Sequence, residues 1–224
     1  MKENSIFLFT ILNSLNVTLD KIEFINDVFY SIYAFNVLDL SITSCLFEIE
    51  KAKAESQYNY SGIVKIQNLY NETYELTIKE SQFINLGSLS SQSALEYDNT
   101  NENAKLAKIN IINCNFLRNS ALKGGAISLK GLTKVTIMNS NLTENEAIAT
   151  AGSEIAGFGG SIYSGCDRPN LCYITLNKSN IQKNKANYLG GAIFLQNYSL
   201  TSKEATIFAE NSAIAANQSN NSYN

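Results

Sequence analysis

The sequence contains no histidine, no tryptophan and only one proline among its 224 residues. Without histidine, and with only four cysteines, no zinc or other metal site is predicted. The formal net charge is −3 and only two arginines occur, so the chain lacks the basic stripe typical of nucleic-acid binding. No apolar run approaches the ~20 residues that span a bilayer, so no transmembrane segment is predicted. No cofactor is predicted either.

Charged residues are scarce as well, at 17% of the chain against about a quarter in average proteins. The rarity of proline favours stacked sheets, because proline cannot donate a hydrogen bond to a β-ladder. Apolar residues do not recur over long segments at the spacings of an amphipathic helix. The sequence therefore predicts an all-β protein.

A four-point pattern of apolar or small residues recurs along the chain at spacings of two, three and two. Spacings of two are typical of strands, because successive side chains point to opposite faces. The single spacing of three predicts a bend that returns the next strand to the same interior. Such internal repeats indicate a solenoid. The six complete copies are Val17, Leu19, Ile22, Phe24; Leu40, Ile42, Cys45, Phe47; Leu76, Ile78, Ser81, Phe83; Ile109, Ile111, Cys114, Phe116; Val135, Ile137, Ser140, Leu142; and Ile174, Leu176, Ser179, Ile181.

Stacking these units in register places equivalent residues in columns. The last position of the pattern, with Phe208 from a seventh incomplete copy, predicts an interior column of Phe24, Phe47, Phe83, Phe116, Leu142, Ile181 and Phe208. An asparagine follows three residues later in four copies, at Asn119, Asn145, Asn184 and Asn211. Asparagine tolerates the left-handed conformation, and stacked amides can bond one another in a ladder.

Double glycines precede a short strand in three copies. They are Gly124 and Gly125, Gly159 and Gly160, and Gly190 and Gly191. They predict a turn with positive φ and a close approach of backbones. A phosphate-binding loop is not favoured, because the glycines precede a strand and no Gly-Lys-Ser/Thr follows. Weaker copies without glycine are expected at Tyr33-Ala34-Phe35 and Ser93-Ala94-Leu95.

The four cysteines divide into two kinds. Cys45 and Cys114 share a column two coils apart, about 9.6 Å at the usual strand spacing. Disulfide Cα separations rarely exceed about 6.8 Å, so these two are expected to be buried free thiols. Cys166 and Cys172 close a short loop, and a disulfide between them would fit an oxidising compartment. The alternative for this second pair is two free loop thiols.

Insertions between repeats are expected at Lys51–Ser61, Asp98–Ala104, Ser164–Leu171 and Asn197–Glu204, and such loops often carry the binding surface of a solenoid. N-glycosylation patterns in predicted loops occur at Asn59, Asn71 and Asn197. Residues 1–216 are expected to form one domain, a segment of a longer solenoid, and residues 217–224 a disordered tail. Residues 1–15 resemble a signal peptide, but Asn4–Leu8 also aligns with Gly191–Leu195 as a repeat strand.

The motifs Phe116-Leu117-Arg118-Asn119 with Gly124-Gly125-Ala126-Ile127, and Gly190-Gly191-Ala192-Ile193, resemble the paired FxxN and GGA[ILV] tetrads of polymorphic outer membrane protein repeats. That family is best known from chlamydial surface proteins, and similar repeats occur in large protist surface proteins. The resemblance implies a right-handed parallel β-helix of the pectin-lyase-like type, here with six to seven coils, displayed extracellularly or at a cell surface and often adhesive.

Three functions are compatible with these observations. The favoured one is a non-catalytic surface module whose side loops bind a glycan or a protein. The second is a structural spacer within a larger surface protein. The third is a polysaccharide lyase or hydrolase, which is disfavoured because the five aspartates form no matching cluster in the predicted columns. No catalytic residue is therefore assigned.

Overall fold

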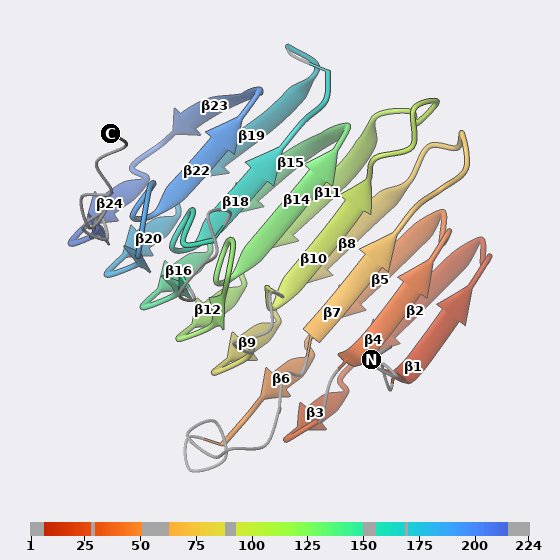
Figure 1. Ribbon diagram of the computed structural model, residues 1–224. Coiled ribbons are helices and arrows are strands. Elements are labelled where there is room, and N and C mark those ends of the chain that lie inside the picture. Colours follow the sequence, from red (N-terminus) through yellow and green to blue (C-terminus); the bar gives the residue numbers. More distant parts are fainter. Residues whose placement is uncertain are drawn as a thin grey trace, which may run out of the picture.

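The structure is a computed structural model that describes residues 7–27, 30–50, 63–87, 93–149, 156–168 and 170–214. Within these ranges the chain forms strands and turns but no helix. All neighbouring strands are parallel. Three seven-stranded sheets each take one strand from every coil, so the fold is a parallel β-helix of seven coils (Figure 1). The predicted solenoid and its number of coils are confirmed.

The strands fall into four sheets, here named A to D. Sheet A contains β1 (Phe7–Leu12), β4 (Tyr30–Phe35), β7 (Ile63–Gln67), β10 (Leu95–Asn99), β14 (Ile127–Gly131), β18 (Ile162–Gly165) and β22 (Ile193–Gln196). Sheet B contains β2 (Asn16–Asp20), β5 (Asp39–Thr43), β8 (Glu75–Lys79), β11 (Ala107–Ile112), β15 (Thr133–Met138), β19 (Cys172–Asn177) and β23 (Tyr198–Lys203). Sheet C contains β3 (Glu23–Ile25), β6 (Leu46–Glu48), β9 (Gln82–Ile84), β12 (Asn115–Leu117), β16 (Asn141–Thr143), β20 (Asn180–Gln182) and β24 (Ile207–Ala209). The small sheet D contains β13 (Ser120–Ala121), β17 (Glu146–Ala147), β21 (Lys185–Ala186) and β25 (Ser212–Ala213).

The predicted bend between sheets B and C rests on one left-handed residue per coil. In all six complete copies the second residue of the three-residue spacing has a φ of 47° to 55°. These residues are Lys21, Ser44, Glu80, Asn113, Asn139 and Lys178. A single left-handed residue reverses the local curvature, so both flanking strands direct their apolar side chains into the same interior.

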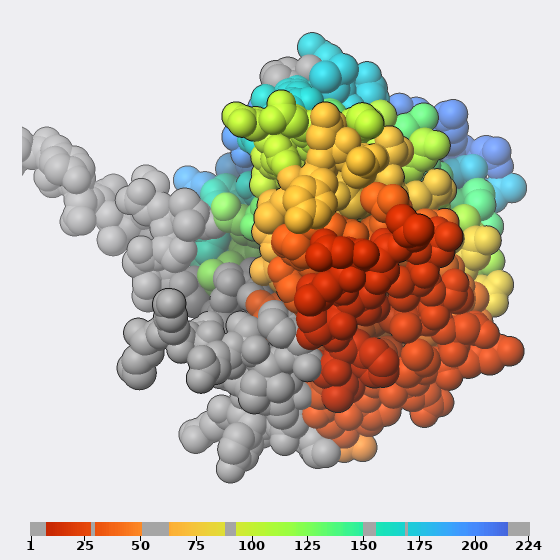
Figure 2. Space-filling view, turned by 90° about the vertical axis from the view of Figure 1, so that its right-hand side faces the viewer, coloured from red at the N-terminus to blue at the C-terminus, as the bar shows by residue number. Residues whose placement is uncertain are grey.

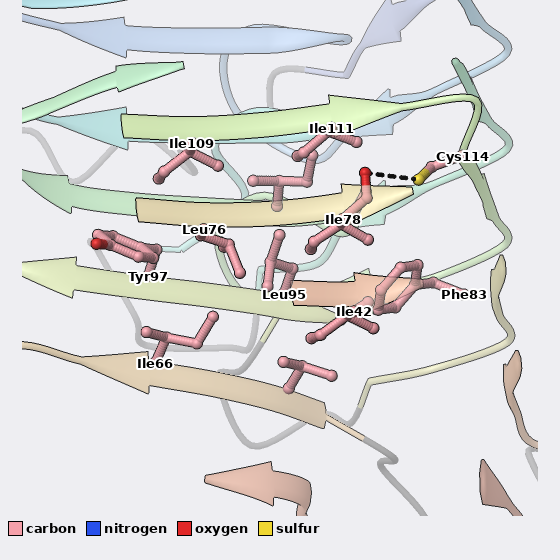
Figure 3. Close-up of a cluster of buried hydrophobic side chains, with 14 of the residues drawn as sticks. Ile42, Ile66, Leu76, Ile78, Phe83, Leu95, Tyr97, Ile109, Ile111 and Cys114 are labelled. Atoms are coloured by element: carbon pink, nitrogen blue, oxygen red, sulfur yellow. Dashed lines mark hydrogen bonds between the residues drawn. The ribbon is translucent and has the colours of Figure 1, made fainter. Parts of the chain in front are cut away.

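The predicted phenylalanine column fills the interior. Neighbouring rings are stacked at centroid distances of 4.5 to 4.8 Å, with interplanar angles of 9° or less. Phe24, Phe47, Phe83, Phe116, Leu142 and Ile181 are all buried. Isoleucine and leucine side chains of sheets A and B pack beside the rings and complete the core (Figure 3). Each buried large side chain stabilises the fold by about 1.5–3 kcal/mol.

The two end coils are less well buried. Phe208 keeps its predicted place opposite Ile181, yet it is 46% exposed, because β24 pairs on one side only among the described strands. At the other end, which faces the viewer in Figure 2, Phe9 is 41% exposed and packs edge-on against Phe24. The interior column is therefore buried from Phe24 to Ile181 and partly exposed to solvent at Phe208.

The predicted asparagine ladder is present and buried. Asn119, Asn145 and Asn184 each donate a side-chain hydrogen bond to the asparagine of the following coil, at 2.9 to 3.0 Å. The same Oδ1 also accepts the backbone N–H of the preceding asparagine. The second amide hydrogen binds the carbonyl oxygen of a core residue one coil earlier.

One detail of the asparagine prediction is wrong. The left-handed residue of this turn is the one before each ladder asparagine, namely Arg118, Glu144, Lys183 and Glu210, with φ of 54° to 57°. The left-handed turn directs the asparagine side chain inward, where its amide replaces the water that the turn would otherwise need.

The two glycines of each pair serve different purposes, as the pair at Gly124 and Gly125 illustrates. Gly124 has a φ of 63°, a conformation that side chains other than glycine rarely adopt. At Gly125 a Cβ atom would lie 2.6 Å from the carbonyl oxygen of Glu146 in the next coil. The predicted positive φ and close approach are both confirmed.

The predicted register of the weaker copies is wrong in the first two coils. Phe9 aligns through Ile32, Val64, Leu95, Ile127 and Ile162 with Ile193, whereas the sequence alignment placed Ile6 there. Ala34 pairs with Ile66 in a different column from Ala126, whereas Ala94 is placed as predicted. In the second coil the connection before β4 is shorter than those before β10 and β14, and the register shift between Tyr30 and Ile32 offsets this by one residue, which leaves the three-residue difference. Phe7–Leu12 form β1. The signal peptide remains an alternative prediction for residues 1–15. Residues 1–6 and 215–224 lie outside the described residues.

Both predictions about the cysteines hold. Cys45 and Cys114 are free and buried. Their thiols hydrogen-bond to backbone carbonyls, and the contact of Cys114 with Ile78 is drawn in Figure 3. Cys166 and Cys172 form a disulfide.

Candidate functional site

Two long loops flank a short turn at the edge where sheet A passes into sheet B. Residues 100–106 connect β10 to β11 in the fourth coil, and residues 166–171 connect β18 to β19 in the sixth. In the coil between them only Leu132 separates β14 from β15. A hollow of about 270 Å³ lies over this short turn. We call it the edge hollow; its lining includes Thr100, Asn101, Glu102, Leu132, Asp167 and Arg168.

The short turn between the loops depends on Gly131. Its φ is 79°, and a Cβ atom there would lie 2.1 Å from the carbonyl oxygen of Asn99. Asn99 is buried, and its side chain donates hydrogen bonds to the carbonyl oxygens of Leu132 and Lys105. The floor of the edge hollow is thus a tight turn, and residues of the longer loops on either side complete its lining.

The loop of the sixth coil is fixed at both ends. The Cys166–Cys172 disulfide closes it, and the N–H of Cys166 donates to the carbonyl oxygen of Gln196 at 3.0 Å. Arg168 reaches across the fifth coil, where its guanidinium donates to the carbonyl oxygens of Ala104, at 3.1 Å, and Glu102. Arg168 therefore ties the two long loops together, and Asp167 projects from a constrained segment.

An apolar cluster supports this edge from below. The disulfide packs against Leu132, with Leu106 and Tyr198 around it. The hydroxyl of Tyr198 hydrogen-bonds to Thr133 Oγ1 at 2.7 Å and to the carbonyl oxygen of Gly131 at 3.0 Å. Burial raises the pKa of Tyr198 to about 12, so this hydroxyl stays protonated and structural at physiological pH.

A second hollow, of about 210 Å³, lies beside the first on the outer face of sheet A. We call it the face hollow; its lining includes Thr100, Lys130, Tyr163, Gly165, Asp167 and Gln196. Lys130, Gly165 and Gln196 are in-register partners on β14, β18 and β22. Because Gly165 has no side chain, the column of outward side chains is interrupted there. That gap forms the face hollow.

The hydroxyl of Tyr163 is directed toward this gap. A Cβ atom built on Gly165 would lie 3.5 Å from Tyr163 Oη, an ordinary van der Waals contact. The ring of Phe194 stacks on that of Tyr163 at 5.7 Å with an interplanar angle of 0°, and Lys123 Nζ lies 4.9 Å from the ring centroid. These neighbours hold the ring in place. Burial raises the pKa of Tyr163, so the hydroxyl remains a hydrogen-bond donor and acceptor.

A pair of carboxylates lies on the same face, one strand further toward the N-terminal end. Glu96 and Asp98 alternate with inward residues on β10, and Lys65 Nζ lies 3.6 Å from Glu96 Oε2. Burial raises the pKa of the Glu96 carboxyl, and Lys65 opposes that shift. Asp98 Oδ1 accepts hydrogen bonds from the N–H and hydroxyl of Thr100 at 3.1 and 2.7 Å. The space beside this pair is only about 20 Å³, enough for a single water.

The structure brings together two of the predicted insertions, at 98–104 and 164–171. The insertion predicted at Asn197–Glu204 is wrong, because Tyr198–Lys203 form β23 and pair in register with β19, although Asn197 itself lines the face hollow. Asn197 is exposed and donates a hydrogen bond to the carbonyl oxygen of Cys166. Asn71 is exposed, whereas Asn59 and the insertion at Lys51–Ser61 lie outside the described residues. Glycosylation of these asparagines stays a prediction.

Sequence reasoning did not find Lys130, Tyr163, Gly165 or Gln196. These residues are neighbours only because of the strand register of sheet A. That register cannot be read from the sequence, because the loops before the strands vary in length. The one available signal is Gly165, because a glycine at an outward position of a strand often marks a close approach or a ligand.

No family model, curated protein or solved structure matches the chain. The likeness to polymorphic outer membrane protein repeats therefore stays a prediction. Among the described residues no helix is long and apolar enough to cross a membrane. In the same part of the chain, no three histidine, cysteine, aspartate or glutamate side chains gather in an arrangement that could hold a metal ion.

Proposed function

We propose that the chain is a non-catalytic glycan-binding module of an extracellular or cell-surface protein. The observation that carries this proposal is the face hollow, where a hydroxyl, an ammonium group, a carboxylate and an amide surround a gap at Gly165. Sugars present many hydroxyl groups, each of which donates and accepts hydrogen bonds. A hollow that offers both kinds of partner over a rigid sheet suits such a ligand.

Two polar groups of the face hollow support binding because they lack partners. Within the described ranges the side chains of Lys130 and Asp167 form no hydrogen bond or ion pair, and Lys130 acts on Glu96 only through its charge. Both are held by rigid elements, Lys130 by β14 and Asp167 by the disulfide-closed loop. The backbone at both positions is therefore already ordered before a ligand binds, which favours affinity.

Binding is a better proposal than catalysis because of how the nearby carboxylates are used. Glu96 is paired with Lys65 and mostly buried, and Asp98 is bound to Thr100. The space beside them does not admit a sugar ring. The extracellular setting is supported by the disulfide, since disulfides persist mainly in oxidising compartments. The resemblance of the repeats to those of polymorphic outer membrane proteins supports the same setting.

A glycan array with the purified chain tests the proposal, followed by calorimetry on each glycan bound. The variant Gly165→Leu fills the face hollow at an outward strand position. The contacts there leave room for a Cβ atom. We expect it to lower affinity by at least about tenfold. The control Thr136→Leu adds the same side chain on the outer face of sheet B and should leave affinity unchanged.

The structural-spacer alternative predicts a different outcome. A spacer would bind no glycan on the array, and neither substitution would alter any interaction. Equal binding by the native chain and by Gly165→Leu would place the ligand elsewhere and would overturn the assignment of the face hollow.

A further inference from the structure

We infer that the ligand is an uncharged oligosaccharide of at least two sugar units, which passes from the face hollow into the edge hollow beside Asp167. The inference rests on the proposed glycan binding and adds the length and charge of the ligand. Three observations carry it: the two hollows adjoin, each is small, and their charges cancel.

The two hollows adjoin because they share lining residues. Thr100 and Asp167 contribute to both. Thr100 belongs to the loop of the fourth coil and Asp167 to the loop of the sixth, so the two residues mark the passage between the hollows from opposite loops. Because Asp167 lines both hollows, a ligand that fills the face hollow and extends past this residue reaches the edge hollow.

Each hollow is too small for a large ligand. Their volumes of about 270 and 210 Å³ lie below the ~300–1,000 Å³ typical of pockets for drug-sized molecules. One hollow accommodates a single sugar ring, and two adjoining hollows accommodate two linked rings. The geometry therefore points to an oligosaccharide whose affinity grows when the second ring is added.

The charges of the described lining residues balance. Lys130 and Arg168 contribute two positive charges, and Glu102 and Asp167 contribute two negative charges, which gives a net charge of zero. Arg168 already donates to two backbone carbonyls and is not free to bind a carboxylate in bidentate fashion. A chain of uronic acids would place a carboxylate on successive rings; Lys130 would pair with one of them in the face hollow, but the next would lie beside Glu102 and Asp167. Uncharged sugars avoid this repulsion.

Substitution of Asp167 tests whether the ligand extends from the face hollow into the edge hollow. A carboxylate at the junction can accept hydrogen bonds from hydroxyl groups of both rings, and such charge-assisted bonds are stronger than neutral ones. Its loop is fixed by the Cys166–Cys172 disulfide, so the carboxylate stays at the junction. The variant Asp167→Asn keeps the shape of the side chain and removes the charge.

The experiment is isothermal titration of the full chain with two sets of probes. The first set is gluco-, manno-, galacto- and xylo-oligosaccharides of one to four units, and the second is oligogalacturonides of the same lengths. We expect one uncharged series to bind, with at least tenfold higher affinity for two or three units than for one. Raising the salt concentration should change that affinity by less than twofold.

Asp167→Asn should lower the affinity for the longer sugar at least fivefold and that for the single sugar less. The control Asp39→Asn removes an exposed carboxylate on β5 and should change neither. Equal affinities for one and for several units, or preference for the oligogalacturonides, would overturn this inference while leaving glycan binding intact. If neither set of probes binds, this inference is overturned; if in addition the glycan array shows no ligand, the proposed function fails with it.

Discussion

The side-chain amide of Asn119 donates a hydrogen bond to the side-chain oxygen of Asn145 in the next coil, at 2.9 Å. Both side chains are fully buried. Asn145 in turn donates to Asn184, and its oxygen also accepts the backbone N–H of Asn119. Polar groups buried in this way stabilise the fold only while each has a partner, so the ladder makes every coil dependent on its neighbours.

Removing one member of the ladder should therefore be costly. Asn145→Ala leaves the backbone N–H and side-chain amide of Asn119 without their acceptor, and each buried unpaired group costs about 1–3 kcal/mol. We expect the free energy of unfolding, measured by urea denaturation, to fall by at least about 2 kcal/mol. Asn141→Ala is the control, because Asn141 accepts an exposed bond from Asn180. A similar loss for both variants would contradict the role of the buried ladder.

The aromatic column makes a second prediction about stability. Phe83 is fully buried between the rings of Phe47 and Phe116, so Phe83→Ala should destabilise the fold by about 3–5 kcal/mol. Phe208→Ala should cost well under half as much, because Phe208 is 46% exposed. Thermal or chemical unfolding of the two variants under the same conditions measures the difference. If the two losses were equal, the burial described for the column would be wrong.

Much of this architecture could be predicted from spacing alone. The period-two strands, the bend, the phenylalanine column and the asparagine ladder follow from residues that recur in each coil, such as Phe83 and Phe116. The prediction failed where the loops vary. Ala34 was aligned with Ala126 because both lie ten residues after a phenylalanine, yet the connection before β4 is shorter than that before β14, which places Ala34 in another column.

The candidate site was harder to predict for the same physical reason. Lys130, Gly165 and Gln196 adjoin only because three strands pair in register, and the connections before those strands differ in length. The insertions that form the edge hollow were predicted as loops. The two insertions meet across Leu132 because the turn at Gly131 is short. The repeat pattern does not predict that turn.

Glu96 should make the stability depend on pH. Burial raises the pKa of its carboxyl in the folded state above the value of about 4.3 in the unfolded chain. The folded state then binds the proton more tightly, so this residue's contribution falls as the pH rises from about 4.3 through the folded pKa. We expect Glu96→Gln to make the free energy of unfolding less dependent on pH in that range. A steeper loss of stability with rising pH in the variant would contradict the direction of the shift.

The Cys166–Cys172 disulfide should affect glycan affinity more than it affects the stability of the fold. Closing a loop with a sequence separation of 6 contributes about 2 kcal/mol by chain entropy, so Cys166→Ser with Cys172→Ser should leave the chain folded. The same change frees the loop that carries Asp167, and we expect glycan affinity measured by calorimetry to fall at least about tenfold. Unchanged affinity in a folded double variant would show that the loop needs no covalent closure.

The claim on which the rest depends is that each coil lies in register on the one before it. Ser81 occupies the column between Cys45 and Cys114, and its hydroxyl lies 3.1 Å from the backbone nitrogen of Cys45. In-register strands are about 4.7–4.9 Å apart, within the ~4.4–6.8 Å span of disulfide Cα atoms. Oxidation of the variant Ser81→Cys, followed by peptide mapping with mass spectrometry, tests the register directly. We predict a disulfide between the introduced thiol and Cys45 or Cys114, with Cys166 and Cys172 still joined; an introduced thiol that stays free, or that links to the Cys166 loop, would contradict the account.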